Sequence, residues 1–180
     1  MENYLSDRVK NLKSESAFEV LNQAQRLEAQ GMDIVHLEIG QPDFETPEHI
    51  SQSACDAIKS GITQYSPSQG ELQLRQEIAN HVKKYKNVDT NPEEIVVVPG
   101  GKPVMFYAML ALINPGDEVL YPNPGFPIYE SLINFTGGKA VPVPVLQENK
   151  FKYKAEQIES LITDKTKLLI INSPGNPTGG

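Results

Sequence analysis

Short apolar runs alternate with helical patterns from residue 94 onward, and this alternation constrains the fold more than any other feature. The β-branched run Ile95-Val96-Val97-Val98 predicts a strand covered on both faces. Further strands are predicted at Glu118–Tyr121 and Lys167–Ile171, and the two prolines within Lys139–Val145 favour an edge strand there. Helical patterns separate these runs, over Lys102–Ile113, Ile128–Phe135 and Ala155–Ile162. Strands and helices in this order build βαβ units, so we expect an α/β fold with a mostly parallel sheet flanked by helices.

The first 93 residues carry helical patterns with clear ends. One helix should stop near Gly31, because glycine readily ends a helix. A second should begin at Thr46-Pro47 and close at Gly61, since proline suits the first turn of a helix. A third fits Glu71–Lys86, and Ile34–Ile39 is typical of a short strand.

Three segments rich in glycine and proline directly follow predicted strands. They are Pro99-Gly100-Gly101-Lys102, Pro122-Asn123-Pro124-Gly125-Phe126, and Ser173 to Gly180. In parallel sheets, ligands collect at the carboxyl ends of the strands. We therefore expect the three segments to lie on one side of the sheet and to form the functional site.

The first of these segments favours an anion. The backbone N–H groups at the start of a helix are unpaired and attract negative charge, so Gly101 and Lys102 suit a phosphate. The segment is not a Walker loop, because Val96 replaces its first glycine and Pro103 follows the lysine. By itself, the pattern also fits a plain turn from strand to helix.

The other two segments offer an aromatic ring and an amide. The ring of Phe126 could stack on a flat cofactor, although a phenylalanine facing the core gives the same pattern. The amide of Asn176 supplies a donor and an acceptor together. The Asn176-Pro177 bond has access to the cis form, which would fix the direction of that amide. Without context, this last segment is also typical of an ordinary turn.

Charge and composition exclude several classes of protein. The net charge is −7, which argues against a nucleic-acid partner because phosphate backbones need clustered Lys and Arg. The longest apolar run, Val104–Ile113, is too short to span a bilayer, and the N-terminus lacks a signal-peptide pattern. The single cysteine, Cys55, fits a reducing compartment, so we expect a cytoplasmic protein. No metal-ligand spacing joins the histidines, which are His36, His49 and His81.

Taken together and in this order, the motifs resemble those of fold-type I aminotransferases, the class that includes aspartate aminotransferase. The resemblance runs over nearly the whole chain. The matching segments are Leu37-Glu38-Ile39-Gly40-Gln41-Pro42-Asp43-Phe44, Gln64-Tyr65-Ser66-Pro67 with Gly70 and Leu74-Arg75, Gly100-Gly101-Lys102, Asn114-Pro115-Gly116-Asp117-Glu118-Val119, Asn123-Pro124-Gly125-Phe126-Pro127 with Tyr129, and Asn176-Pro177-Thr178-Gly179.

The resemblance implies pyridoxal 5′-phosphate as the cofactor and gives each motif a role. The loop at Gly101 and Lys102 would hold the cofactor phosphate through backbone N–H groups. Phe126 would stack on the pyridine ring, where relatives often carry Trp or Tyr. Asn176 would donate a hydrogen bond to the phenolic oxygen of the cofactor, and Phe126 and Asn176 would also contact the substrate.

The same resemblance implies contacts beyond the cofactor ring. The backbone of Gly40 would bind the substrate carboxylate, and Tyr65 would reach the phosphate bound by a partner subunit, which implies a homodimer. Residues 1–45 would form an N-terminal arm and part of a small domain, and residues 46–180 the N-terminal part of the large cofactor-binding domain.

The implied reaction is transfer of an amino group between an amino acid and a 2-oxo acid. In the family, the lysine that forms a Schiff base with the cofactor follows the segment matching Asn176, so we expect it beyond Gly180 and predict that these residues alone are inactive. They would also leave strand edges open, because later strands of the family insert into this sheet. Two alternatives remain open, a pyridoxal-phosphate-dependent C–S lyase and a non-catalytic, aminotransferase-like effector-binding domain of a regulator.

Overall fold

The computed structural model describes residues 4–12 and 16–180. The chain divides into two compact units, one made of Met1–Ile39 with Lys102–Gly180 and the other of Gly40–Gly101. These units do not test the predicted division at residue 45, which stays a prediction. None of the helices in the described residues has the length and apolar character that crossing a bilayer demands.

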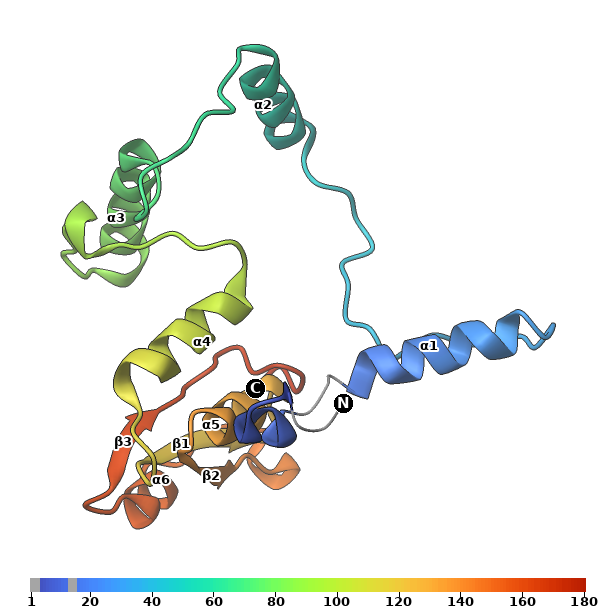
Figure 1. Ribbon diagram of the computed structural model, residues 1–180, viewed down its shortest axis with the longest axis vertical. Helices are drawn as coiled ribbons and strands as arrows, with labels where there is room; N and C mark the ends of the chain where they lie inside the picture. Colours follow the sequence, from blue (N-terminus) through green and yellow to red (C-terminus); the bar gives the residue numbers. More distant parts are fainter. Residues whose placement is uncertain (1–3, 13–15) are drawn as a thin grey trace. The chain divides into compact units, whose positions relative to one another are not determined.

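The first unit contains a three-stranded parallel sheet with the order β2-β1-β3 (Figure 1). The central strand β1 is Glu118–Asn123, and it pairs with β2 (Lys139–Pro144) on one side and β3 (Thr166–Leu169) on the other. The predicted α/β class with a parallel sheet is therefore confirmed, and the strand with the two prolines lies at an edge as expected. Within the described residues, β3 has β1 as its sole partner and its outer edge is unpaired.

Helices connect the strands in the predicted order. The helix α4 (Gly101–Leu112) leads into β1, α5 (Ile128–Phe135) connects β1 to β2, and α6 (Ala155–Leu161) precedes β3. The remaining elements of this unit are α1 (Ser16–Glu28) and the 3-10 turns η2 (Asp7–Asn11) and η4 (Gln147–Asn149). The helices α4, α5 and α6 match their predicted ranges to within one residue at each end.

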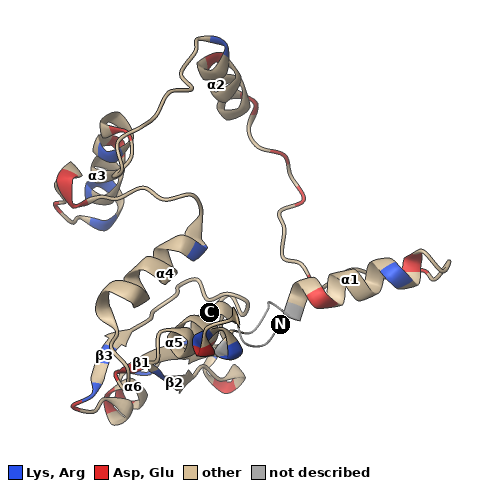
Figure 2. Cartoon of the chain, viewed as in Figure 1, with Lys and Arg blue, Asp and Glu red and all other residues tan. Residues whose placement is uncertain are grey.

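The core of this unit lies between the sheet and two of its helices. Met109 of α4 and Ile133 of α5 pack with Val119 of β1 and are almost completely buried. The helix α4 carries one charged residue, Lys102 at its start, which explains why it can lie against apolar neighbours (Figure 2). On the opposite face of the sheet Leu120 and Val143 are fully buried, and α6 contacts β2.

The second unit is helical. It contains α2 (Glu48–Lys59), α3 (Leu72–Lys86) and the 3-10 turn η3 (Pro92–Glu94). The helix ends predicted near Gly31 and Gly61 are confirmed, and both glycines adopt a positive φ, the left-handed conformation that ends a helix at low cost.

Two predicted strands are absent from the described residues. Residues 34–39 and the run Ile95–Val98 form no strand. The prediction of a strand at Ile95–Val98 is wrong, because β-branched residues form a strand when a neighbouring strand pairs with their backbone groups. In this region, Val97 N–H donates to the carbonyl of Gln69 at 2.9 Å, which is a loop contact and not a ladder.

Candidate functional site

Two of the three predicted loops meet at the carboxyl end of the sheet. The chain around the end of β1 contributes Pro122, within the strand, and Pro124, just after it, to a small cavity, and the loop after β3 contributes Asn172 and Asn176 to the same cavity. Parallel pairing of β1 and β3 brings the carboxyl ends of both strands to one edge, and this produces the juxtaposition. The expectation of a shared edge is confirmed for these two loops.

The loop after β1 presents Phe126 as a half-buried ring. The ring meets Tyr129 edge to face, with 5.8 Å between centroids and 90° between planes, a favoured aromatic geometry. Gly125 is required beside it, because a Cβ there would collide with the carbonyl oxygen of Pro122. Burial raises the pKa of Tyr129, and nearby Tyr153 raises it further, so Tyr129 is a neutral support for the ring.

The loop after β3 is closed by its own hydrogen bonds. Gly175 N–H donates to the carbonyl of Gly180 at 2.8 Å, and Asn176 N–H donates to Oδ1 of Asn172 at 2.7 Å. The Asn176-Pro177 bond is cis, as the sequence allowed. Asn176 itself is exposed, and within residues 4–12 and 16–180 its side-chain amide has no hydrogen-bond partner. An exposed amide on a tightly closed loop is available to a ligand.

The first turn of α4 lies beside the start of α5. A groove of about 270 Å³ joins Lys102 and Pro103 to Ile128, which is two residues after Phe126. Lys102 Nζ also stands 5.6 Å from the centroid of the Phe18 ring. Gly101 has open space where a Cβ would lie, so a ligand could approach its backbone closely. These features fit the predicted anion site at a helix start.

Gly40, Tyr65 and Gly101 belong to the second unit, and their positions are described within it alone. Tyr65 is fully exposed. The turn that follows it is anchored by Arg75, whose Nε donates to the carbonyl of Gly70 at 3.1 Å. Gly40 lies in an irregular segment with open space around its Cα.

Three residues that hold these loops were not predicted as site residues. Arg75 was noted solely as part of a motif, yet it is buried and bonds two backbone carbonyls. Asn172 and Tyr153 bond each other beneath the loop of Asn176. The sequence gives no signal for Tyr153, because its contact with Asn172, 19 residues later in the chain, is produced by the fold.

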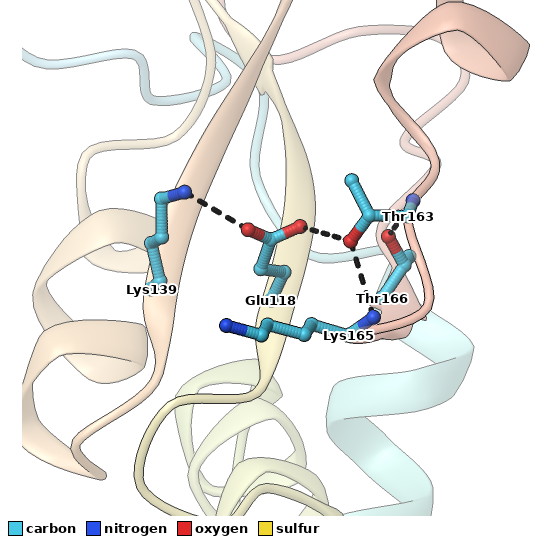
Figure 3. A network of polar contacts seen from close by, with 5 residues as sticks. All are labelled: Glu118, Lys139, Thr163, Lys165 and Thr166. Carbon is cyan, nitrogen blue, oxygen red and sulfur yellow. Dashed lines mark hydrogen bonds and ion pairs between the residues drawn. The ribbon is translucent and has the colours of Figure 1, made fainter.

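The opposite, amino end of the sheet carries a polar network centred on Glu118 (Figure 3). Its carboxylate accepts hydrogen bonds from Lys139 Nζ at 2.9 Å and Thr163 Oγ1 at 2.7 Å. The bond from Lys139 and then that from Thr163 hold the pKa of Glu118 below its usual value, and the charge of Lys165 adds to this. Both oxygens of the carboxylate therefore accept a hydrogen bond, and the network connects the starts of β1 and β2 with the turn before β3.

The histidines show no metal site. In the described part of the chain, no group of His, Cys, Asp or Glu side chains could hold a metal ion. His36 lies between two carboxylates, with Nδ1 at 2.6 Å from Glu38 and Nε2 at 2.8 Å from Glu28. The hydrogen bonds to Glu38 and then Glu28 raise the pKa of His36 to about 9. His81 packs its ring on Tyr85, with 4.5 Å between centroids.

Comparison with known proteins gives the family. A model described as aminotransferase class I and II matches residues 32–180. The chain belongs to this aminotransferase family. Enzymes of the family use pyridoxal 5′-phosphate, and the matched range includes every segment that the sequence predicted to form the site.

Individual aminotransferases are similar over almost the whole chain. A probable aspartate/prephenate aminotransferase of Aquifex aeolicus is 39% identical over 175 residues, which are 97% of this chain and 44% of that protein. The aspartate aminotransferase of Bacillus subtilis is 38% identical, with 97% and 44% covered. The chain therefore spans less than half the length of these curated relatives.

Solved aminotransferase structures share the fold. The aspartate aminotransferase of Thermus thermophilus with maleate superposes with a TM-score of 0.91 at 38% identity, covering 96% of this chain and 45% of that one. An alanine aminotransferase of Pyrococcus furiosus gives a TM-score of 0.92 at 34% identity, with 98% and 45% covered. The parallel sheet and its helices are thus part of the aspartate aminotransferase fold.

Proposed function

We propose that the complete protein containing this chain is a pyridoxal-phosphate-dependent aminotransferase that moves an amino group between an amino acid and a 2-oxo acid. The observation that carries the proposal is the meeting of the Phe126 and Asn176 loops at the carboxyl edge of a sheet of this family. The similar proteins include an aspartate aminotransferase and an alanine aminotransferase, so the proposal is for a class of substrate.

The residues of this chain fit the cofactor. The half-buried face of Phe126 offers a surface for a flat ring, and the exposed amide of Asn176 offers a donor for a ring oxygen. The open backbone of Gly101 and the first turn at Lys102 suit a phosphate. The cofactor supplies an electron sink for the charge that forms when the amino acid loses its α-proton.

The chain's own residues bind and orient in this proposal. Phe126 fixes the plane of the ring, Asn176 fixes its rotation through one oxygen, and the helix start at Lys102 fixes the phosphate end. Gly40 offers its backbone to the substrate carboxylate. The three contacts to the cofactor fix its position and its orientation. A reactant that is already positioned loses less entropy when it reacts.

The lysine that carries the cofactor is proposed to lie outside residues 1–180. Lys165 is no candidate, because its backbone carbonyl pairs with Glu118 N–H at 2.8 Å at the amino end of the sheet. Lys102 stands at the phosphate end of the proposed site. We also propose that the protein is a cytoplasmic homodimer in which the exposed ring of Tyr65 reaches the phosphate of the partner subunit.

A direct test uses the purified complete protein. Binding of pyridoxal phosphate is followed by absorbance, and amino-group transfer is measured as a new 2-oxo acid together with a new amino acid from 2-oxoglutarate. Asn176→Ala should weaken both, whereas Asn80→Ala, at an exposed position of α3, should weaken neither. Release of ammonia and a thiol would instead identify a C–S lyase, and ligand binding without turnover would identify an effector-binding domain. Light scattering measures the subunit number.

A further inference from the structure

A short chain of hydrogen bonds runs from Tyr153 to Asn176 through Asn172. Asn172 N–H donates to the hydroxyl oxygen of Tyr153 at 3.1 Å, and that hydroxyl donates to the carbonyl of Asn172 at 3.3 Å. Oδ1 of Asn172 then accepts the backbone N–H of Asn176 at 2.7 Å. One hydroxyl thus holds both backbone polar groups of Asn172, and the side chain of Asn172 holds Asn176.

This chain of bonds lies in a nearly filled space. The cavity lined by Tyr153, Asn172 and Asn176 has a volume of about 10 Å³, no more than a single water needs. Tyr153 is half-buried and lies two residues before α6, outside the loop that carries Asn176. The hydroxyl of Tyr153 therefore fills most of the space beside Asn172.

A packing role alone does not account for the hydroxyl. A phenylalanine would fill the same volume beside Phe151 and Val145, which line the same cavity. It would, however, leave the N–H and the carbonyl of Asn172 without this partner, and unpaired backbone groups in a closed space are costly. The hydroxyl therefore has a polar task, which is to fix Asn172 and through it the loop.

We propose that Tyr153 is a positioning residue that acts through Asn172 to aim the side-chain amide of Asn176 at the ring oxygen of the cofactor. This inference rests on the proposed function, because it assigns the amide to that oxygen. The backbone N–H of Asn176 is bonded to Asn172, and that of Gly175 is bonded to Gly180. Because the backbone of Asn176 is held by Asn172, the direction of its side-chain amide depends on how firmly Asn172 is anchored.

The consequence is electrostatic. An N–H donated to the ring oxygen draws negative charge from it, which disfavours uptake of the neighbouring proton on the bound cofactor. If the amide is misaligned, the proton binds more tightly and the pH midpoint of the cofactor absorbance rises. Loss of one neutral hydrogen bond corresponds to a shift of about half a pH unit to one pH unit.

The experiment compares variants of the complete, cofactor-loaded protein by absorbance across pH. Tyr153→Phe should raise the midpoint by about half a unit, and Asn176→Ala should raise it further. In the double variant, Tyr153→Phe should add nothing to Asn176→Ala, because both act on one bond. Tyr85→Phe is the matched control, since this exposed tyrosine of α3 packs on His81 and should leave the midpoint unchanged.

A second route keeps the test independent of any one variant. Asn172→Ala removes the acceptor for Asn176 N–H but leaves the backbone bonds to Tyr153, and it should raise the midpoint in the same direction. An unchanged midpoint in both Tyr153→Phe and Asn172→Ala, with cofactor bound, overturns the inference. The inference is also overturned if Tyr153→Phe raises the midpoint by the same amount in the Asn176→Ala background as it does in the wild type.

Amide hydrogen exchange in the cofactor-free protein separates this inference from the proposed function. Tyr153→Phe should speed exchange at Asn172 and Asn176 about tenfold, the effect of one lost hydrogen bond on local opening. A wild-type protein that binds no pyridoxal phosphate refutes the proposed function, and exchange still decides whether Tyr153 anchors the loop. Unchanged exchange refutes the anchoring whatever the cofactor does.

Discussion

Arg75 should hold two loops of the second unit together, and its removal offers the sharpest test of the fold there. Its side chain is 7% exposed, and its guanidinium donates to the carbonyl of Gly70 at 3.1 Å and to that of Pro92 at 2.7 Å. Gly70 in turn packs against Val97, so closely that a Cβ at Gly70 would lie 2.7 Å from the Val97 Cβ. The guanidinium therefore connects the turn after Tyr65 with the approach to the Gly101 loop.

The size of the effect follows from these contacts. Each hydrogen bond from a charged group contributes about 1.5–3 kcal/mol, and the stem of Met preserves most of the packing in Arg75→Met. The ion pair with Glu93 at 3.5 Å adds little, because Glu93 is 67% exposed and exposed pairs contribute about 0–1 kcal/mol. We expect a local loss of about 3 kcal/mol, which is on the order of a 100-fold change in the opening equilibrium.

The assay is backbone hydrogen exchange in the complete protein at Gly70 and Val97, whose N–H groups donate to Pro67 and Gln69. Arg75→Met should accelerate both amides on the order of 100-fold, and Arg75→Lys, which can reach one carbonyl but not both, should have an intermediate effect. Glu93→Gln is the control and should leave both rates nearly unchanged. Exchange in Arg75→Met within about threefold of wild type would refute this account of the loops.

Three further predictions concern single side chains. Phe126→Leu should raise the dissociation constant for pyridoxal phosphate about 3- to 10-fold through lost stacking, while Phe126→Trp should not; equal titrations by absorbance would contradict a stacking role. Because the pKa of Glu118 is lowered, its contribution to stability is present above pH 4.5 and lost as pH falls below that; the difference in Tm between wild type and Glu118→Gln should shrink on acidification, and a constant difference would argue against it. Because the pKa of His36 is raised, its contacts stabilise the fold below pH 6.5 and are lost as pH rises through about 9, so its NMR titration should centre near 9 and move down in Glu38→Gln; a wild-type midpoint near 6.5 would be incompatible with this.

The helices and the site edge could be predicted because their signals are local. Gly31 and Gly61 end helices through a conformation that glycine adopts cheaply, so the sequence alone marks those ends. The alternation of apolar runs and helices implied parallel strands, and parallel strands bring Phe126 and Asn176 to one edge. Predicting the helix ends and the shared edge requires only a few neighbouring residues and one rule of topology.

The supporting contacts could not be predicted because they join residues far apart in the sequence. Arg75 bonds a carbonyl 17 residues away, and Glu118 bonds Thr163 across 45 residues. A buried arginine on a helix whose last turn is rich in lysine has the same local pattern as an exposed one. The sequence therefore predicts which loops share an edge of the sheet better than which side chains hold those loops in place.

The run Ile95–Val98 is the instructive error, and it leads to a last prediction. Val96 is 60% exposed although valine and isoleucine favour sheets, so the run has the residues of a strand without a partner. The chain spans less than half of its relatives, and strands from the remaining length are expected to insert into this sheet. In the complete protein, the amides of Val96 and Val98 should exchange as slowly as those of β1. Exchange as fast as at exposed loop residues would show that the β-branched pattern has some other cause, and Val96→Asp should then be tolerated instead of destabilising the sheet by burying a charge.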